Sequence, residues 1–393
     1  MKLLGFKYLK LQRILTLTII LTFSSMLFLM TAFSLLGFYR GLTSYLGEGE
    51  DIVAVYDRRS RTPFTGLVPA YLADKISALN GVLACSPEAI VPCIVKGKSV
   101  FLRGIIPEDF TKLNQLTIIE GGMLELNDLD SALIGKNAAE RLRINLNDRI
   151  LVLGVLRDRY IELQVKGIFQ SYSCMDDEIL APLHVGQWLR GTDYGHVTLI
   201  RVKIDRNIIS PSEILGEIAE EASESSSAPK PSGQKPHHPS ITSRMAIRFK
   251  SGDIGVKEAY KFMRNYMDRY GLTRESLLIL SVMVFLFSCA SIAAASEMIL
   301  SQHRGEIRVL RSIGASKKVL KRDMLIKLLP FSMTASLIGF ALALAILTLI
   351  REAGCMLVLS HTPPLQIDLP VIILNLTLAF LLVSLSILKS ELE

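Results

Sequence analysis

Four long runs of residues contain no charged side chain, and these runs limit the fold more than any other feature. They are Ile14–Tyr39, Ser276–Ser296, Leu328–Ile350 and Leu369–Leu388, with 26, 21, 23 and 20 residues. A bilayer core about 30 Å thick needs roughly 20 helical residues, so each run is long enough to cross it. Half of the 393 residues are hydrophobic and the mean hydropathy is +0.38, so the composition also argues against a water-soluble fold.

The first run has two interpretations, because basic residues precede it as they precede the apolar core of a signal peptide. That core is about 7–15 residues long in a signal peptide, and this run is nearly twice as long. We therefore expect an uncleaved membrane anchor. Cleavage near Ala32-Phe33-Ser34, which weakly resembles a cleavage signal, is the alternative.

The flanks of the runs predict how the chain is threaded, because Lys and Arg are retained on the cytoplasmic side. Residues 1–13 hold four basic and no acidic groups, and residues 297–327 hold eight basic against three acidic. Residues 351–368 hold one basic against two acidic groups. We expect a multi-pass protein of the cell membrane with both termini cytoplasmic. The net charge of +7 then reflects orientation and contact with membrane lipid, and we expect no nucleic-acid partner.

The predicted fold class is an α-helical membrane protein with four transmembrane helices plus a large α+β extracytoplasmic domain between helices 1 and 2. The expected segments are a cytoplasmic N-terminal segment (1–13), transmembrane helix 1 (14–39), the extracytoplasmic domain (40–275), transmembrane helix 2 (276–299), a cytoplasmic coupling loop (300–323), transmembrane helix 3 (324–350), a short external loop (351–368), transmembrane helix 4 (369–388) and a cytoplasmic tail (389–393).

Within residues 40–275 the apolar periodicity changes repeatedly between strand and helix, which is typical of an α+β domain. We expect strands at 52–55, 90–105, 149–155, 160–169 and 197–204, a helix at 69–81, and a strand turning into a helix over 131–143.

The end of this domain contains a polar segment and then a helical pattern. Residues 222–241 are rich in Ser, Pro, Lys and His, so we expect a flexible insertion. Residues 254–270 place apolar side chains at helical spacing, and we expect one helix that continues directly into the second span. Such a helix would carry motion mechanically.

No motif for catalysis is found. The stretch Gly97-Lys98-Ser99 is the nearest approach to a phosphate-binding loop, but Pro92 stands where the first glycine would be and the stretch continues as a strand. Zinc-protease helices, nucleophile elbows and Cys-x-x-Cys pairs are absent from the sequence. We predict no catalytic residues and no cofactor, and the runs without ionisable side chains argue against ion-coupled transport.

Two further groups of residues left alternatives open. His237 and His238 could bind a metal, but no third ligand stands at a useful spacing, so we predict no metal site. Cys85 and Cys93 could form a disulfide in the external domain, or they could be buried free thiols.

The segment between the second and third runs carries the most specific pattern. Ile307, Leu310 and Ile313 form an apolar stripe at helical spacing, with Arg308 and Arg311 beside it. Gly314 can adopt a left-handed conformation that ends this helix, and Ser316 can cap the next one. An amphipathic helix on the inner membrane surface, followed by a turn, is expected. A simple surface anchor is one interpretation of it.

This segment resembles the signature of the FtsX/MacB-like (MacB/LolC-type) permeases of ABC transporters. The residues that carry the resemblance are Arg304, Glu306, Ile307, Leu310, Arg311, Ile313, Gly314, Ala315 and Ser316. The external region also resembles the MacB-type periplasmic domain, at Arg103-Gly104, Pro107 to Phe110, Glu120-Gly121-Gly122, Ile134-Gly135-Lys136, Leu146-Asn147-Asp148 and Gly167-Ile168-Phe169.

The resemblance implies a permease subunit that couples a separate ABC-type ATP-binding subunit to the external domain by mechanotransmission. It also implies a second permease protomer, and export or extraction of a lipid, lipoprotein, peptide or drug. The coupling residues would be Arg304, Glu306, Ile307, Arg308, Leu310, Arg311, Ile313, Gly314, Ala315 and Ser316. Two alternatives are a regulatory scaffold that activates an external partner such as a cell-wall hydrolase, and an enzyme anchored by four helices. The absence of catalytic motifs argues against the latter.

Overall fold

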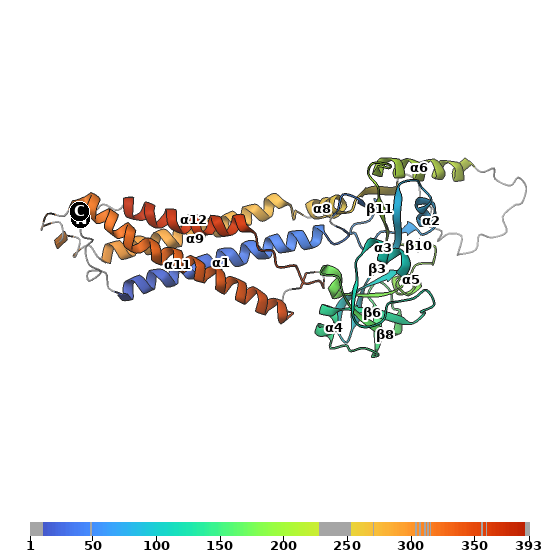
Figure 1. The fold of residues 1–393 in the computed structure, drawn as a ribbon. Helices are drawn as coiled ribbons and strands as arrows, with labels where there is room; N and C mark the ends of the chain where they lie inside the picture. The colour runs from blue at the N-terminus through green and yellow to red at the C-terminus, as the bar shows by residue number, and fades with distance from the viewer. Residues whose placement is uncertain are drawn as a thin grey trace, which may run out of the picture. The chain divides into compact units, whose positions relative to one another are not determined.

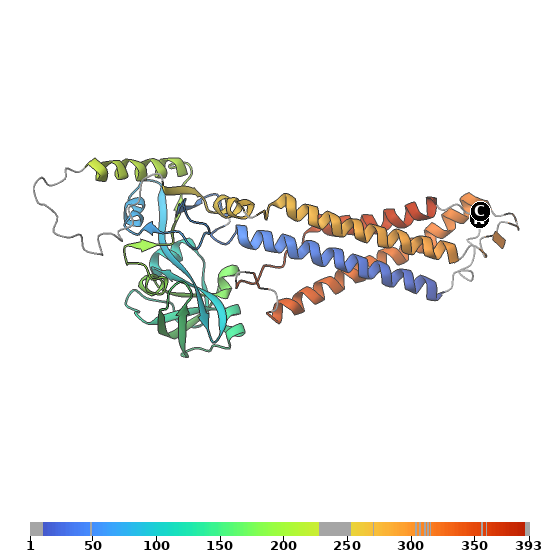
Figure 2. The ribbon, with the colours of Figure 1, turned by 180° about the vertical axis from the view of Figure 1, so that it is seen from behind.

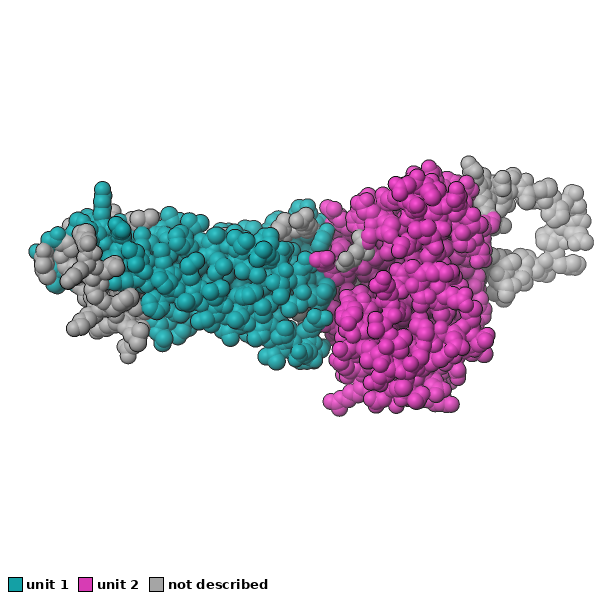
Figure 3. Space-filling model, in the orientation of Figure 1, with its two compact units in different colours: residues 1–39, 272–356, 363–393 teal, residues 40–271, 357–362 magenta. Residues whose placement is uncertain are grey.

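The computed structural model divides the chain into two compact units, which are described separately here (Figure 3). The helical unit comprises residues 1–39, 272–356 and 363–393, and the α+β unit comprises residues 40–271 and 357–362. The structure describes residues 11–389 except 48, 228–252, 270, 303, 304, 306, 307, 310, 311, 313, 315, 355, 356 and 359. Most of the predicted N-terminal segment and of the predicted insertion therefore lies outside the described residues.

Each of the four apolar runs lies within a long helix. These are α1 (Leu11–Thr43), α9 (Arg274–Gln302), α11 (Lys317–Glu352) and α12 (Leu369–Lys389). By length and composition, Thr18–Thr43 in α1 and the whole of α11 qualify as membrane spans. The apolar stretches Glu275–Ser288 of α9 and Leu369–Leu385 of α12 are shorter. The topology with four spans stays a prediction.

The four helices of the helical unit run side by side, as Figures 1 and 2 show from opposite directions. Buried polar side chains join them: the Asn375 amide donates to the hydroxyl oxygens of Ser25, at 2.6 Å, and Ser336, at 2.7 Å. The Ser288 hydroxyl donates to the carbonyl of Ser24 at 3.2 Å. A polar group in an apolar bundle is costly without a partner, so these bonds favour one packing of α1, α9, α11 and α12.

The α+β unit is built on one large mixed sheet. Along the sheet the order is β12 (Ile254–Glu258), β1 (Ile52–Asp57), β11 (Leu199–Ile204), β3 (Val82–Val95), β4 (Lys98–Ile105), β9 (Glu178–Pro182), β6 (Ser131–Gly135), β8 (Tyr160–Gln170) and β5 (Thr117–Gly121). Strand β7 (Arg149–Gly154) pairs with β3 and β8, and β2 (Val68–Pro69) pairs with β10 (His196–Val197). The β4–β9 and β6–β8 pairs are parallel.

Short helices cover the sheet and close its cores. They are α2 (Leu72–Ser77), α3 (Pro107–Leu113), α4 (Lys136–Leu142), the 3₁₀ helix η2 (Cys174–Asp177), α5 (Leu183–Arg190), α6 (Pro211–Ser227) and α8 (Ala259–Arg269). One core lies between the sheet and helices α4 and α5, and a second lies beneath α2 and α6. The predicted α+β fold of this region is confirmed.

Several predicted elements differ from the observed ones. Strands β7 and β8 and the β6–α4 pair agree with the sequence pattern, whereas the helix expected over 69–81 is limited to α2. The expected continuous helix from 254 into the second span is wrong. Residues Ile254–Glu258 form strand β12, which pairs antiparallel with β1 and buries Ile254 and Val256. Helix α8 ends at Arg269, Gly271 has φ +73°, and α9 begins only at Arg274.

Candidate functional site: a coupling turn and a buried charge ladder

The turn predicted to end the coupling segment is present. Gly314 has φ +101°, a conformation that favours glycine, and a Cβ added there would meet no neighbouring atom within 4 Å. Ser316 is the N-cap of α11, where its hydroxyl oxygen accepts a hydrogen bond from the Val319 amide at 3.4 Å. The turn therefore leads directly into the first residue of α11.

Three of the predicted coupling residues, Arg308, Gly314 and Ser316, belong to the described part of the chain. Gly305 and Arg308 are helical, as the amphipathic pattern predicts. The other seven lie outside the described residues: Arg304, Glu306, Ile307, Leu310, Arg311, Ile313 and Ala315. The role of the coupling residues is therefore a prediction.

A line of buried charges crosses the centre of the sheet in the α+β unit. Four adjacent strands, β11, β3, β4 and β9, contribute one charged residue each. We call these residues, Arg201, Glu88, Arg103 and Glu178, the charge ladder. Their side chains are at most 1% exposed, and positive and negative charges alternate along it. Each buried charge therefore has an opposite charge on a neighbouring strand.

The distances within the ladder are those of strong ionic hydrogen bonds. Arg201 Nε lies 2.5 Å from Glu88 Oε1, and Arg103 Nη1 lies 2.6 Å from Glu88 Oε2. Arg103 also donates through Nε and Nη2 to the two carboxylate oxygens of Glu178, at 2.7 and 3.1 Å. The planar guanidinium of Arg103 thus joins both carboxylates, a geometry that lysine could not reproduce.

The segment that follows α1 packs against the charge ladder and forms hydrogen bonds with it. The hydroxyl of Tyr45 donates to Glu178, and the ring of Tyr45 lies 4.9 Å from the guanidinium carbon of Arg103. The carbonyl of Leu46 accepts a hydrogen bond from Arg201 Nη1 at 3.2 Å. Since α1 ends at Thr43, the residues that contact the charge ladder follow this helix directly.

The loop between α11 and α12 also reaches the ladder. We call the described residues 357, 358 and 360–362 the strap; it belongs to the α+β unit although both flanking helices belong to the other. His361 is 5% exposed, and its Nε2 donates to Glu178 at 2.9 Å. Its ring stacks on Phe101, with the ring centres 5.3 Å apart. The Thr362 amide and hydroxyl donate to the two carboxylate oxygens of Asp177, at 2.8 and 3.0 Å.

Ser360 completes the docking of the strap. Its hydroxyl lies 2.9 Å from the Ser99 hydroxyl, and its carbonyl accepts a hydrogen bond from Arg141 Nη2 at 3.2 Å. Three consecutive residues, 360–362, are therefore held by side chains of β4, α4 and the η2–β9 junction.

The electrostatics of the ladder keep its carboxylate ionised. Burial alone would raise the pKa of Glu178, but the charge of Arg103 and the hydrogen bond from His361 lower that pKa to about 2. Burial, with the neighbouring Glu178, raises the pKa of the Tyr45 phenol well above its ordinary value. Tyr45 therefore stays a neutral donor and Glu178 a charged acceptor at any physiological pH.

Sequence reasoning missed most of this site. In the sequence, Arg103 stands out only as a landmark of the family resemblance. Glu88 and Arg103 each interrupt an apolar strand, and that interruption is the signal that could have suggested a buried ion pair. His361 gives no comparable signal, because a histidine between Ser360 and Thr362 is ordinary in a connecting segment.

Neither disulfide nor metal chemistry is found among the described residues. Cys85 and Cys93 are free and buried, in two different cores, so the disulfide left open by the sequence does not form. Within the described residues no group of three or more His, Cys, Asp and Glu side chains could hold a metal ion. His237 and His238 lie outside the described residues.

Several solved structures are similar to part of this chain, and three of them are named here. They are the periplasmic region of MacB from Actinobacillus actinomycetemcomitans (15% identity, TM-score 0.36, covering 55% of this chain and 92% of that chain), the extracellular domain of the noncanonic ABC-type transporter YknZ from Gram-positive bacteria (16%, 0.32, 44% and 91%) and a permease-protein domain from Porphyromonas gingivalis (14%, 0.31, 51% and 98%). No curated protein matches the sequence.

The family comparison concerns the C-terminal part of the chain. Residues 278–390 match the model of the FtsX-like permease C-terminal domain. This match includes the coupling segment, α11 and α12. The family resemblance predicted from the sequence is therefore confirmed over residues 278–390, which match the FtsX-like permease C-terminal domain.

Proposed function

We propose that this chain is the permease subunit of an ABC transporter, with four transmembrane helices and both termini in the cytoplasm. It transmits ATP-driven conformational change from a separate ATP-binding subunit to its extracytoplasmic α+β unit. The transmitted motion exports or extracts a lipid, lipoprotein, peptide or drug. A second permease protomer pairs with it, and nucleotide hydrolysis belongs to the other subunit.

The observation that carries this proposal is the position of α11 in the chain. The coupling turn at Gly314 and Ser316 starts this helix of 36 residues, which at 1.5 Å per residue is about 54 Å long. The strap follows the other end of the helix after a few residues and binds Asp177 and Glu178. A push on the coupling turn can therefore reach the charge ladder through one helix, whose backbone hydrogen bonds are interrupted at Pro330.

Contact of the helical unit with membrane lipid is supported by its exposed apolar side chains. Ile19 of α1, Ile279 of α9, Leu349 of α11 and Leu385 of α12 are 58–64% exposed. Large aliphatic side chains exposed on every helix are unfavourable in water and favourable against lipid tails.

The test replaces three charged residues of the coupling segment, Glu306, Arg308 and Arg311, by alanine. The full-length chain is purified in lipid nanodiscs with the ATP-binding subunit that co-purifies with it. We expect at least a tenfold loss of affinity for that subunit, because its binding groove loses its ionic contacts. Full affinity together with full ATP turnover would contradict the proposal.

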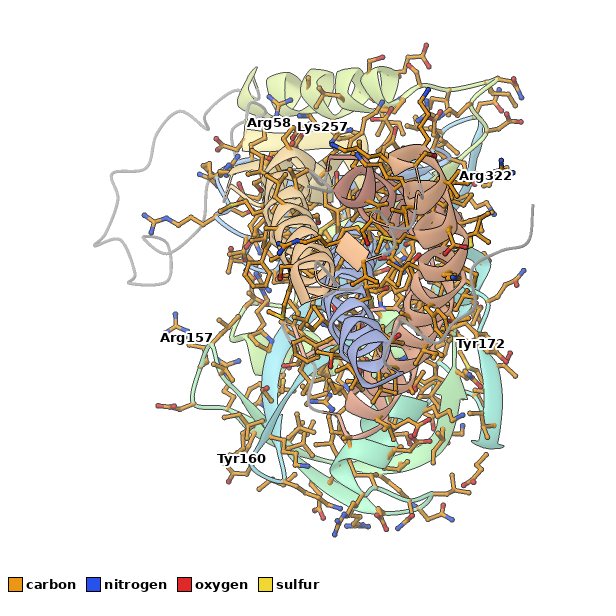
Figure 4. All side chains as sticks on the ribbon, turned by 90° about the vertical axis from the view of Figure 1, so that its left-hand side faces the viewer. Arg58, Arg157, Tyr160, Tyr172, Lys257 and Arg322 are labelled. Carbon is orange, nitrogen blue, oxygen red and sulfur yellow. The ribbon has the colours of Figure 1, made fainter. Side chains whose placement is uncertain are left out.

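The matched control removes the same set of charges from the α+β unit. Arg149, Arg157 and Glu162 lie on the β7–β8 hairpin, and Figure 4 shows Arg157 pointing away from the unit. Arg149 and Glu162 have side chains that are 69% and 58% exposed. Their replacement by alanine should leave the affinity unchanged, since exposed charges contribute little to stability.

A further inference from the structure

We propose that the strap is a releasable latch, which docks on Asp177 and Glu178 in one state of the transport cycle and leaves them in another. This inference rests on the proposed function and adds to it a second, non-covalent point of control. The α+β unit is joined covalently to α1 and α9. When the strap is docked, hydrogen bonds would also hold this unit to the chain between α11 and α12.

The first argument is that the docking site is specific. Residues 360–362 use two hydroxyls, one imidazole and two backbone groups, and each of these groups meets a complementary partner. The partners Asp177 and Glu178 are at most 1% exposed. A loop that merely lay on the surface would not insert a histidine between Tyr45 and Phe101.

The second argument is that the site tolerates the departure of the strap. Glu178 would keep both hydrogen bonds from Arg103 and the one from Tyr45. Asp177 would keep Asn137, at 3.4 Å, and the Arg141 guanidinium, at 3.9 Å. No buried carboxylate is left without a partner, so release avoids the large penalty of an uncompensated charge.

The third argument is that the strap carries part of its own structure. The Val358 amide donates to the His361 carbonyl at 2.9 Å, and the His361 amide donates back to the Val358 carbonyl at 3.0 Å. Ser360, between them, has φ +65°. These bonds join the strap to itself and move with it, so undocking and redocking do not require the loop to unfold and refold.

The test locks the strap with a disulfide. The hydroxyls of Ser99 and Ser360 lie 2.9 Å apart, so the double variant Ser99→Cys/Ser360→Cys brings two thiols together in the docked state. The variant is made in a chain whose native cysteines are replaced. The control pair is Thr117→Cys/Gln170→Cys, which joins facing residues of β5 and β8 that stay paired in the sheet.

The first measurement is disulfide formation in the full-length chain alone, under mild oxidation in nanodiscs. We expect the strap pair to oxidise to at least half the yield of the control pair. A yield near zero for the strap pair, with a normal yield for the control, would overturn the docked state itself.

The second measurement is ATP turnover of the complex before and after oxidation. We expect the oxidised strap pair to lower turnover at least fivefold, with recovery on reduction, and the control pair to leave it unchanged. Unchanged turnover of a fully oxidised strap pair would show that the strap never leaves, which overturns the latch but not the proposed function. Failure of the unmodified chain to bind any ATP-binding subunit would instead overturn the proposed function and the latch with it.

Discussion

The charge ladder makes a quantitative prediction for the substitution Arg103→Met. This change removes the shared partner of Glu88 and Glu178 and leaves two buried carboxylates facing each other without the intervening cation. Removing one partner of a buried ion pair costs about 3–5 kcal/mol. A unit of about 240 residues loses roughly 2–4 °C of its unfolding midpoint per kcal/mol, so we expect a decrease of roughly 6–20 °C.

Trp188 provides the assay, because it is the only tryptophan of the chain and lies in the α+β unit. Its fluorescence during heating of the full-length protein in detergent reports the unfolding of this unit. The control is Arg149→Met, whose ion pair with Glu162 spans 3.8 Å on the exposed surface. Exposed pairs contribute about 0–1 kcal/mol, so the control should lower the midpoint by no more than about 4 °C.

A third variant separates the loss of the cation from the loss of packing. Replacing Arg103 by Met together with Glu178→Gln removes the carboxylate charge that loses its cation, while Glu88 keeps its ion pair with Arg201, and we expect this variant to recover at least half of the lost midpoint. Equal midpoints for Arg103→Met and Arg149→Met would refute the reasoning, because the ladder would then contribute no more than a surface pair.

Three further predictions concern the coupling turn, acid stability and the thiols. Gly314→Ala should strain the turn by about 1–2 kcal/mol and lower ATP turnover of the complex, whereas helical Gly305→Ala should not; equal turnover would contradict this. Because Arg103 and His361 overcome the effect of burial and lower the pKa of Glu178 to about 2, its stabilisation is complete above about pH 4.3 and is lost as the pH falls toward 2. Glu178→Gln should therefore show a smaller fall in thermal midpoint between pH 5 and pH 3, and an identical fall would exclude Glu178 as the source. Burial raises the pKa of Cys85 and Cys93 to about 12, so mass spectrometry should find both unmodified by N-ethylmaleimide at pH 7.5 until urea unfolds the chain.

The parts of the fold that were predicted correctly are those set by local patterns. The uncharged runs, the β6–α4 transition and the turn at Gly314 each follow from residues within a few positions of one another. Helical runs and turns are stabilised by neighbours in sequence, so a single segment contains the information.

The incorrect prediction at 254–270 has a tertiary cause. The pattern from Ile254 to Tyr266 is compatible with a helix, but β1 offers an unpaired edge to which Ile254–Glu258 adds a strand. A sheet edge exists only after distant strands have assembled, and a local pattern cannot show it. The same limit applies to the ladder, whose members are separated by up to 113 residues in the chain.

The strap could not have been predicted for a related reason. His361 lies 183 residues from Glu178, and no residue near it in the sequence indicates a carboxylate partner. Only the tertiary fold shows that Thr362 forms hydrogen bonds with Asp177 and that His361 forms one with Glu178. A contact made by a short connecting segment leaves no periodicity by which it could be found.

The core around the ladder brings together the segments that lead to the four long helices. Tyr45, which follows α1, shares one hydrophobic cluster with Phe262 and Met263 of α8, which precedes α9. His361, which lies between α11 and α12, stacks on Phe101 of the same cluster. The segments that connect this unit to the helical unit therefore meet in a single core rather than in separate ones. Because close-packed cores shift between discrete arrangements rather than deform continuously, a displacement of any one segment must repack the contacts of the others. Mechanical transmission by the proposed permease requires this property, and a domain whose connections ended in independent cores would not have it.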